Sequence, residues 1–552
     1  MSSRVARLAA WCGLLTVIAC AGDRGATEHG GTVVIALRAE PEGLFPPLAT
    51  TANARQVIEV LFDRLALPGP GRATAGDSGF VPQLARRWTW SGDSMSVRFE
   101  LDPKAKWHDG QPVRAEDIAF SFSLYRDPVV ASPSSADLAD VDSVTVADSL
   151  TAVAWFHARS PLQFNDLVWN LVPVPAHVWR DRPRNALLTD SLVRHPVGNG
   201  RFKFLRWDPG DRLIAVADSA NARGRPALDR VIWRFGADDA TNFARLLAGE
   251  VDVFELRTED QYTRVTSTPS LRAEFFPGFE YGYAQFNLHD GANPTAHPIL
   301  GDRATRRALA MATDRRALVQ NVFGPLAVVG FGPFVRAQFT ADTTVAQLPF
   351  DLAAARRTLD SLGWRVGADG IRHRGGRALS LSVNVPSGSV LERLAVVLQD
   401  QWRAAGVHLA IEPLDRSAFL DRVMAHHHFD VIILSTRTWQ SFASLPQSWG
   451  SSGARPGGRN LGGYTNAMFD AQVDSALRSL RTDVIRAHLR NAYTTIVDDA
   501  PAIFLYEARG AVALHRRFVA PPLRGDGWWL DLPSWSVPRA QRLPRDGPGG
   551  QP

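Results

Sequence analysis

The stretch that most constrains the fold of this chain is 106–122, KWHDGQPVRAEDIAFSF. It follows the alternating run 97–101, in which every second side chain is apolar, and this period of two indicates a half-buried strand. The tripeptide 108–110 is a turn signal, because Asp bonds its own backbone and Gly accepts positive φ. Glu116 and Asp117 then suit the first turn of a helix. The stretch therefore predicts a strand–turn–helix unit.

The same stretch also carries a family pattern. Its order W-H-D-G-x-P-x-x-A-E-D-x-x-F-S-F resembles the signature of bacterial solute-binding proteins of the dipeptide, oligopeptide and nickel class. Those proteins are extracytoplasmic receptors of ABC importers. Arg114 is a departure, since the family often has Thr or Ser there as a helix cap, so the cap of this helix is an open question.

Further segments between about residues 32 and 510 resemble the same family. They are the turn 40–47, the P-x-L-A-x-x-W segment 82–88, the P-V-G-N-G segment 196–200, the G-E-V-D segment 249–252, the crossover strand 281–288 and the helical region 300–323. The strand–helix–strand order over 229–254 is consistent with a largely parallel layer.

The resemblance implies an α/β, two-lobed periplasmic-binding-protein (type II) fold with an additional inserted sublobe. At 552 residues the chain is also too long for one ordinary core. The expected division is signal peptide 1–19, lipidated tether 20–31, lobe I from 32–65 plus 191–278 plus 500–537, inserted sublobe 66–190, lobe II 279–499 and C-terminal tail 538–552.

The amino terminus predicts export. Arg4 and Arg7 precede the short apolar run 8–19, which suits a signal peptide and is too short to span a membrane as a mature helix. The segment 17–20, V-I-A-C, resembles a bacterial lipobox and implies cleavage before Cys20 and lipidation of that residue. The alternative is a plain signal peptide with an incidental cysteine.

Charge and motif content argue against several classes of function. A formal charge of +5 over the whole length, without basic clusters interleaved with aromatics, makes nucleic acid a poor partner. The chain has no G-x-S-x-G elbow, H-E-x-x-H motif, P-loop or C-x-x-C pair, so we expect no enzyme activity and no cofactor. The run 426–428 is three consecutive His, which cannot all point at one ion, and we expect a solvated turn rather than a metal site.

The predicted ligand site follows the strand 430–434. The candidate residues are Tyr283, Arg437, Thr438, Trp439, Phe442 and Trp449. Aromatic side chains would line a cleft for a solute, although a place in the lobe core explains them equally well.

An acidic residue is absent where peptide-binding relatives use one. In those relatives an Asp in this loop pairs with the α-amino group of the ligand, yet no acid occurs between Ile432 and Gly463. We therefore do not transfer the amine anchor. If Arg437 points into the cleft, it favours an anionic or carbonyl-rich ligand, and the alternative is a surface Arg paired with a carboxylate.

The function implied by the resemblance is import of a peptide or peptide-like solute. Binding would close two lobes over the solute, and a membrane permease would receive it from a monomeric, lipid-anchored receptor at the periplasmic or extracytoplasmic face. The alternatives are a receptor for signalling or chaperoning without import, a carrier of a metal chelate, an oligosaccharide or haem, and a hydrolase on the same scaffold.

Overall fold

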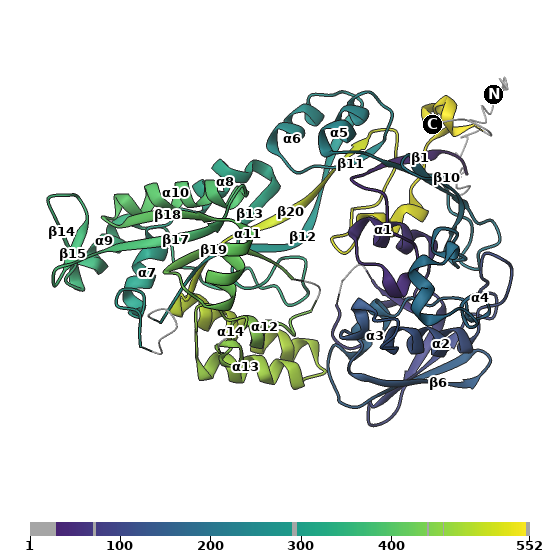
Figure 1. Ribbon diagram of the computed structural model, residues 1–552, viewed down its shortest axis with the longest axis horizontal. Helices are drawn as coiled ribbons and strands as arrows, with labels where there is room; N and C mark the ends of the chain where they lie inside the picture. The colour runs from purple at the N-terminus through teal and green to yellow at the C-terminus, as the bar shows by residue number, and fades with distance from the viewer. Residues whose placement is uncertain (1–28, 70–72, 290–294, 439–440, 456, 548–552) are drawn as a thin grey trace, which may run out of the picture.

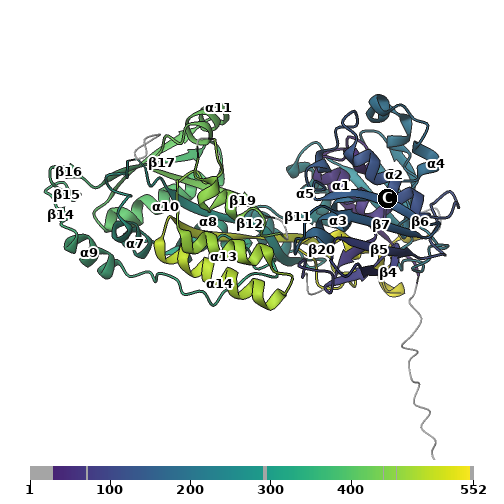
Figure 2. The same ribbon diagram turned by 90° about the horizontal axis from the view of Figure 1, so that it is seen from below.

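The computed structural model describes residues 29–69, 73–289, 295–438, 441–455 and 457–547. Figures 1 and 2 show two bodies joined by a pair of long strands, β12 and β20. Each body has its own hydrophobic core, and the connecting strands contribute to both. The expected two-lobed α/β architecture is therefore present.

One continuous sheet of eleven strands runs through both lobes. Its order is β18 (His408–Leu414), β17 (Ser380–Pro386), β19 (Val431–Arg437), β12 (Leu271–Phe286), β20 (Ala502–His515), β11 (Val253–Glu255), β1 (Thr32–Leu37), β10 (Arg230–Phe235), β9 (Arg212–Ala217) and β8 (Phe202–Asp208), with β13 (Ala327–Val329) beside β20.

The direction of pairing differs along the sheet. In lobe I, β1 pairs in parallel with β10 and β11, and in lobe II, β17 pairs in parallel with β18 and β19. The pairings of β12, β20, β9 and β8 are antiparallel. The sheet is thus mixed, and the parallel layer expected from the strand–helix–strand unit is confined to β11-β1-β10 in lobe I and to β18-β17-β19, at the edge of the sheet, in lobe II. The continuous apolar run of β1 is almost wholly buried, as expected for a strand covered on both faces.

Helices cover the sheet in both lobes. Lobe I has α1 (Ala52–Leu61), α5 (Asp239–Leu247) and α6 (Glu259–Thr266). Lobe II has α7 (Arg303–Met311), α8 (Arg315–Phe323), α9 (Leu352–Ser361), α10 (Val390–Ala404), α11 (Arg416–Ala418), α12 (Leu445–Ser448), α13 (Ala467–Arg478) and α14 (Thr482–Asp499), with a small sheet of β14 (Arg365–Val366), β15 (Arg372–Arg374) and β16 (Arg377–Ala378).

The segment between α1 and β8 contains a separate four-stranded sheet in the order β4-β5-β7-β6. Its strands are β4 (Ala85–Trp90), β5 (Ser96–Leu101), β6 (Val141–Asp148) and β7 (Thr151–Phe156), with α2 (Ala115–Arg126), α3 (Gln163–Asn170), α4 (Ala176–Trp179) and the pair β2 (Ala66–Pro68) and β3 (Phe80–Pro82). Its apolar side chains share one buried cluster with those of α1, β1 and β10, so this sublobe is fixed to lobe I.

The carboxylate of Asp117 holds the parts of the W-H-D-G…A-E-D motif together by hydrogen bonds. Its buried carboxylate accepts hydrogen bonds from Arg114 N at 2.8 Å, Trp107 Nε1 at 3.1 Å and Ala176 N at 2.8 Å. The carboxylate of the third helical residue thus satisfies the backbone amide at the start of α2, in the manner of a capping box. The answer to the open question about Arg114 is that its side chain makes no cap hydrogen bond, while the reciprocal bond from its N–H to Asp117 is present.

The turn before α2 attaches the sublobe to lobe I. His108 donates its backbone N–H to the Gly198 carbonyl oxygen at 2.8 Å, and its Nε2 donates to the Gly200 carbonyl oxygen at 2.9 Å. A Cβ at Gly198 would lie 2.2 Å from the Leu61 carbonyl oxygen, so this close approach requires glycine. The H-D-G and P-V-G-N-G segments are far apart in sequence, and their contact forms the joint between the sublobe and lobe I.

The two connecting strands, β12 and β20, each run from one lobe into the other. In β20, Leu505 and Tyr506 belong to a lobe II core, whereas Val512 and Leu514 belong to the lobe I core. The register between β12 and β20 shifts between Pro277 and Tyr281 and again between Gly282 and Tyr283. Such breaks locally disrupt a ladder and bend strands. We therefore propose that lobe I begins within β20, near residue 510, rather than at the expected residue 500.

The C-terminal residues close lobe I over the start of β1. Thr32 N donates to Asp546 Oδ1 at 2.7 Å, and Arg517 donates to Asp546 at 2.6 Å and to both oxygens of Asp252 at 3.1–3.2 Å. Arg545 adds a hydrogen bond of 2.6 Å to Asp252. The described part of the expected tail is thus integrated into the lobe.

Candidate ligand-binding site

The predicted site residues lie at the end of β19 and in the segment after it. Thr438 is buried: its N–H donates to the Phe279 carbonyl oxygen at 2.7 Å, and its hydroxyl accepts from Gln338 Nε2 at 3.0 Å. Phe442 is buried against Phe339, with ring centroids 6.2 Å apart. Trp439 lies outside the described residues. Thr438 thus holds the end of β19 against β12, while Phe442 packs against the segment that contains Phe339.

Tyr283 and Trp449 belong to a buried aromatic cluster. Their ring centroids are 5.2 Å apart in an edge-to-face contact, and Trp449 contacts Phe504 at the same distance. Trp449 Nε1 donates to the Tyr281 hydroxyl at 3.0 Å, and the Tyr283 hydroxyl lies 3.1 Å from the hydroxyl of Thr436. Burial raises the pKa of both tyrosine hydroxyls. The polar ends of these rings are therefore satisfied inside lobe II, and their assignment to ligand binding stays a prediction.

Arg437 is the exposed member of the predicted set. It forms no ion pair with any described residue, so the alternative of a surface Arg paired with a carboxylate is not what the described structure shows. Its cross-strand neighbour on β12 is Glu280, whose carboxylate accepts from the Tyr506 hydroxyl at 3.5 Å.

A small cavity of about 170 Å³ lies where β12 and β20 pass between the lobes. Buried Glu507 pairs with Arg336 Nη1 at 2.7 Å, and the Arg509 guanidinium lies 3.9 Å from the centroid of the Phe275 ring. Burial raises the pKa of Glu507, while Arg336 acts in the opposite direction. Glu507 is thus buried beside the register break, while its partner Arg336 is exposed.

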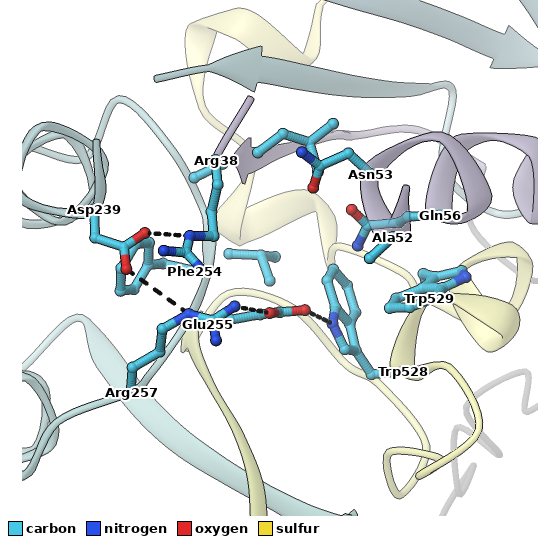
Figure 3. A pocket seen from close by; sticks show the side chains of 13 residues that line it. Arg38, Ala52, Asn53, Gln56, Asp239, Phe254, Glu255, Arg257, Trp528 and Trp529 are labelled. Carbon is cyan, nitrogen blue, oxygen red and sulfur yellow. Dashed lines mark hydrogen bonds and ion pairs between the residues drawn. The ribbon is translucent and has the colours of Figure 1, made fainter. Parts of the chain in front are cut away.

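The larger recess, about 280 Å³, lies in lobe I at the carboxyl ends of β1 and β11 (Figure 3). In open α/β sheets this end of the parallel strands is where ligands bind. The lining residues are Ala36, Leu37, Arg38, Ala52, Asn53, Gln56, Asp239, Val253, Phe254, Glu255, Arg257, Trp528 and Trp529. Figure 1 shows α1, which supplies three of them, on the side of lobe I that faces lobe II.

Charged side chains in the recess are paired with one another. Arg38 Nε lies 2.8 Å from Asp239, and Arg257 lies 3.8 Å from Asp239 and 3.2 Å from Glu255. Trp528 Nε1 donates to the other oxygen of Glu255 at 3.1 Å. Figure 3 shows these contacts as a chain across one side of the recess. Two cations and two anions balance, so the recess provides a polar wall without a net charge.

None of the lining residues was predicted from the sequence. The available signal was positional: Arg38 directly follows the apolar run of β1, and the G-E-V-D segment immediately precedes β11. Residues that follow parallel strands meet at one edge of a sheet. Trp528 and Trp529 gave no such signal, because they come from a short C-terminal 3₁₀ turn, Trp528–Ser534, whose packing is set by tertiary contacts.

The three His residues follow the short π-helix Phe419–Ala425 at the surface of lobe II. His426 Nδ1 lies 3.5 Å from an oxygen of Asp421, and the rings of His426 and His428 are 5.9 Å apart. Within the part of the chain that the structure describes, no group of three or more His, Cys, Asp or Glu side chains is arranged to hold a metal ion.

Comparison with known proteins gives consistent matches over almost the whole chain. Protein XP55 of Streptomyces lividans is 26% identical over 509 residues, which cover 88% of this chain and 86% of that protein. The oligopeptide-binding protein AppA of Bacillus subtilis is 23% identical over 523 residues, covering 92% of this chain and 93% of AppA.

Solved structures share the fold. AppA of Bacillus subtilis in complex with a nonapeptide has a TM-score of 0.66 at 21% identity, covering 93% of this chain and 100% of the other. The unliganded open form of the periplasmic murein tripeptide binding protein MppA has a TM-score of 0.75 at 21% identity, covering 92% and 97%. These likenesses confirm the expected two-lobed, type II periplasmic-binding-protein fold.

The family model described as bacterial extracellular solute-binding proteins, family 5 Middle, matches residues 79–455. The matched region includes the W-H-D-G…A-E-D motif, the sublobe that carries it, the strand β12 and most of lobe II. This chain therefore belongs to the bacterial extracellular solute-binding proteins of family 5.

Proposed function

We propose that this protein is the substrate-binding component of an ABC importer and that it takes a peptide or peptide-like solute between its two lobes. The observation that carries the proposal is the combination of family membership with two separately cored lobes joined at a register break in β12 and β20. A ligand that contacts both lobes favours their closed arrangement, because it gains contacts there that the open arrangement lacks.

The names of the similar proteins support a peptide as the solute. AppA is named as an oligopeptide-binding protein, and its solved complex contains a nonapeptide. MppA is named as a murein tripeptide binding protein. The proposed ligand for this chain is a peptide, and the proposed role is binding and delivery to a permease rather than catalysis.

Small-angle scattering with a defined peptide pool tests the proposal. We expect the radius of gyration to fall when a mixture of peptides of mixed sequence saturates the protein, and we expect the peptides to be recovered unchanged. An unchanged radius of gyration at saturation would contradict lobe closure. Recovery of cleaved peptides would instead favour the hydrolase alternative.

The lipid anchor is a separate part of the proposal. None of the helices in the described portion of the chain is long and apolar enough to cross a membrane. Cys20 and the leader lie outside the described residues, so their support comes from the sequence alone: Arg4 and Arg7, the apolar run 8–19 and the V-I-A-C segment. Acylation at Cys20 would hold the receptor beside its permease at the extracytoplasmic face, with more than one chain needed for stable attachment.

Metabolic labelling with an alkyne fatty acid tests the anchor. The native chain should incorporate label, and Cys20→Ala should abolish the label and move the protein from the membrane fraction to the soluble fraction. Label that persists in Cys20→Ala would exclude this cysteine as the acylated residue. Cys12→Ala, which alters only the leader, is the matched control.

A further inference from the structure

Gln56 is a buried polar side chain without a hydrogen-bond partner among the residues that the structure describes. It is only 4% exposed, and its amide makes no hydrogen bond with any described residue. Neither amide atom of Gln56 is among the fully enclosed unpaired side-chain atoms of the described residues, so both atoms are accessible from the recess. Gln56 lines the recess at the ends of β1 and β11, so its unpaired amide is available to a group that enters there.

Asn53 places a second amide on the same wall. It lies one helical turn before Gln56 on α1, a spacing that brings both side chains to one face. Asn53 Nδ2 donates to the Ala39 carbonyl oxygen at 2.9 Å, which directs its Oδ1 away from that contact. Figure 3 shows both amides on α1, with the Trp528 ring below them.

The charges around the recess do not call for a charged ligand group. Arg38 and Arg257 are already engaged by Asp239 and Glu255. A carboxylate entering the recess would have to compete with those two acids, and an ammonium would meet the two guanidinium groups. Beside these charged groups, the recess presents the neutral amides of Gln56 and Asn53, next to the apolar surface of Trp528 and Phe254.

The size of the recess limits what enters it. At about 280 Å³ it is smaller than the range of about 300–1,000 Å³ that encloses whole drug-sized ligands. It is formed entirely by lobe I, so it suits a group that projects from a solute held between the lobes.

We propose that this recess binds an uncharged carboxamide side chain, that of Gln or Asn, of the peptide that the protein carries. Gln56 offers one donor and one acceptor to the ligand amide, Asn53 Oδ1 accepts from the ligand NH₂ group, and Trp528 packs against the flat amide. This inference rests on the proposed peptide-binding function, and it adds a preference for Gln or Asn over charged or apolar side chains.

Equilibrium dialysis against a peptide mixture tests the inference. The probes are alanine pentapeptides that carry Gln, Glu or Met at each position in turn, at equal concentrations, with the bound fraction quantified by liquid chromatography and mass spectrometry. The variants are Gln56→Met, which keeps length and removes the amide, and Gln111→Met, an exposed control in the turn before α2.

For the native chain and for Gln111→Met we expect the Gln peptide to be enriched over its Glu and Met counterparts at one position. The expected enrichment is about three- to tenfold, the effect of about one net hydrogen bond. Gln56→Met should retain peptides but lose this enrichment. Should Gln56→Met fail to fold, Asn53→Ala, at a half-buried position, should reduce the same enrichment.

The outcomes separate the two levels of the proposal. Equal enrichment in the native chain and in both recess variants, or a native preference for Glu or Met, overturns the recess inference and leaves peptide binding intact. Failure of the native chain to retain any peptide overturns both the proposed function and the inference that depends on it.

Discussion

Replacement of Arg517 by Met should be among the most destabilising single changes in lobe I. The Arg517 guanidinium donates to Asp252, Asp546 and the Thr32 carbonyl oxygen, at 2.6–3.2 Å. The three charged side chains are 2%, 0% and 1% exposed. Removal of the cation leaves two carboxylates in the core, with Arg545 as the remaining cation on Asp252.

The size of the effect follows from this burial. Breaking a buried ion pair by removing one partner costs about 3–5 kcal/mol, because the other charge stays buried without compensation. For a domain of about 150–250 residues, 1 kcal/mol lowers Tm by about 2–4 °C, so the transition of lobe I should fall by roughly 6–20 °C.

Differential scanning calorimetry measures this shift. Arg516→Met is the matched control, because Arg516 is the exposed neighbour in sequence, and its free energy of unfolding should change by no more than about 0.5 kcal/mol. If both variants lowered the transition equally, the network would contribute nothing specific and the reasoning would be refuted.

Three further changes test other parts of the structure. Burial raises the pKa of Asp166 to about 7 from an ordinary 3.8, so the folded state keeps a proton that the unfolded state releases, and the free energy of unfolding falls as pH rises from about 4 to 7. Asp166→Asn should therefore raise the denaturation midpoint at pH 8 and leave it nearly unchanged at pH 4. An equal gain at both pH values would contradict the raised pKa of Asp166. Gly198→Ala should destabilise the joint between sublobe and lobe I, because its Cβ would meet the Leu61 carbonyl oxygen at 2.2 Å, and a thermal melt indistinguishable from native would show that the joint adapts. Asp117→Ala removes the acceptor for three hydrogen bonds in the family motif and should cost about 3 kcal/mol or more in chemical denaturation, whereas exposed Glu116→Ala should have little effect.

Periodicity and family pattern predicted the elements that lie wholly within one core. The alternation over 97–101, the continuous apolar run after residue 31 and the helix ended by Gly363 all appear as β5, β1 and α9. Each of these elements packs within a single lobe, so its apolar residues follow a regular pattern that is visible within a few positions of the sequence.

The connecting strands β12 and β20 could not be predicted in full, because the cores of both lobes set the burial of their side chains. Only 281–288 of β12 was expected, since its first half, from Leu271, has mostly half-buried side chains and shows no alternation. β20 was not expected as a strand, because its side chains enter cores of both lobes. A strand that passes between two bodies changes its surroundings along its length, and its pattern changes too.

The site was the hardest part to predict. An aromatic side chain such as Trp449 has the same sequence signature in a lobe core as in a cleft wall, and only its contacts with Tyr281 and Tyr283 show its packing. The recess, in turn, gathers side chains from segments as distant as Arg38 and Trp528, and that convergence exists only in three dimensions.

The hydrogen bonds from Thr32 to Asp546 and from Arg542 to the His29 carbonyl oxygen bring the beginning and end of the described chain to one pole of lobe I. An affinity tag added after residue 552 would thus leave the molecule near the point where an amino-terminal linker leaves it. Capture on a sensor chip through either end should present lobe II to the flowing solution in a similar orientation. Binding measured with an amino-terminal tag and with a carboxyl-terminal tag should therefore give the same result.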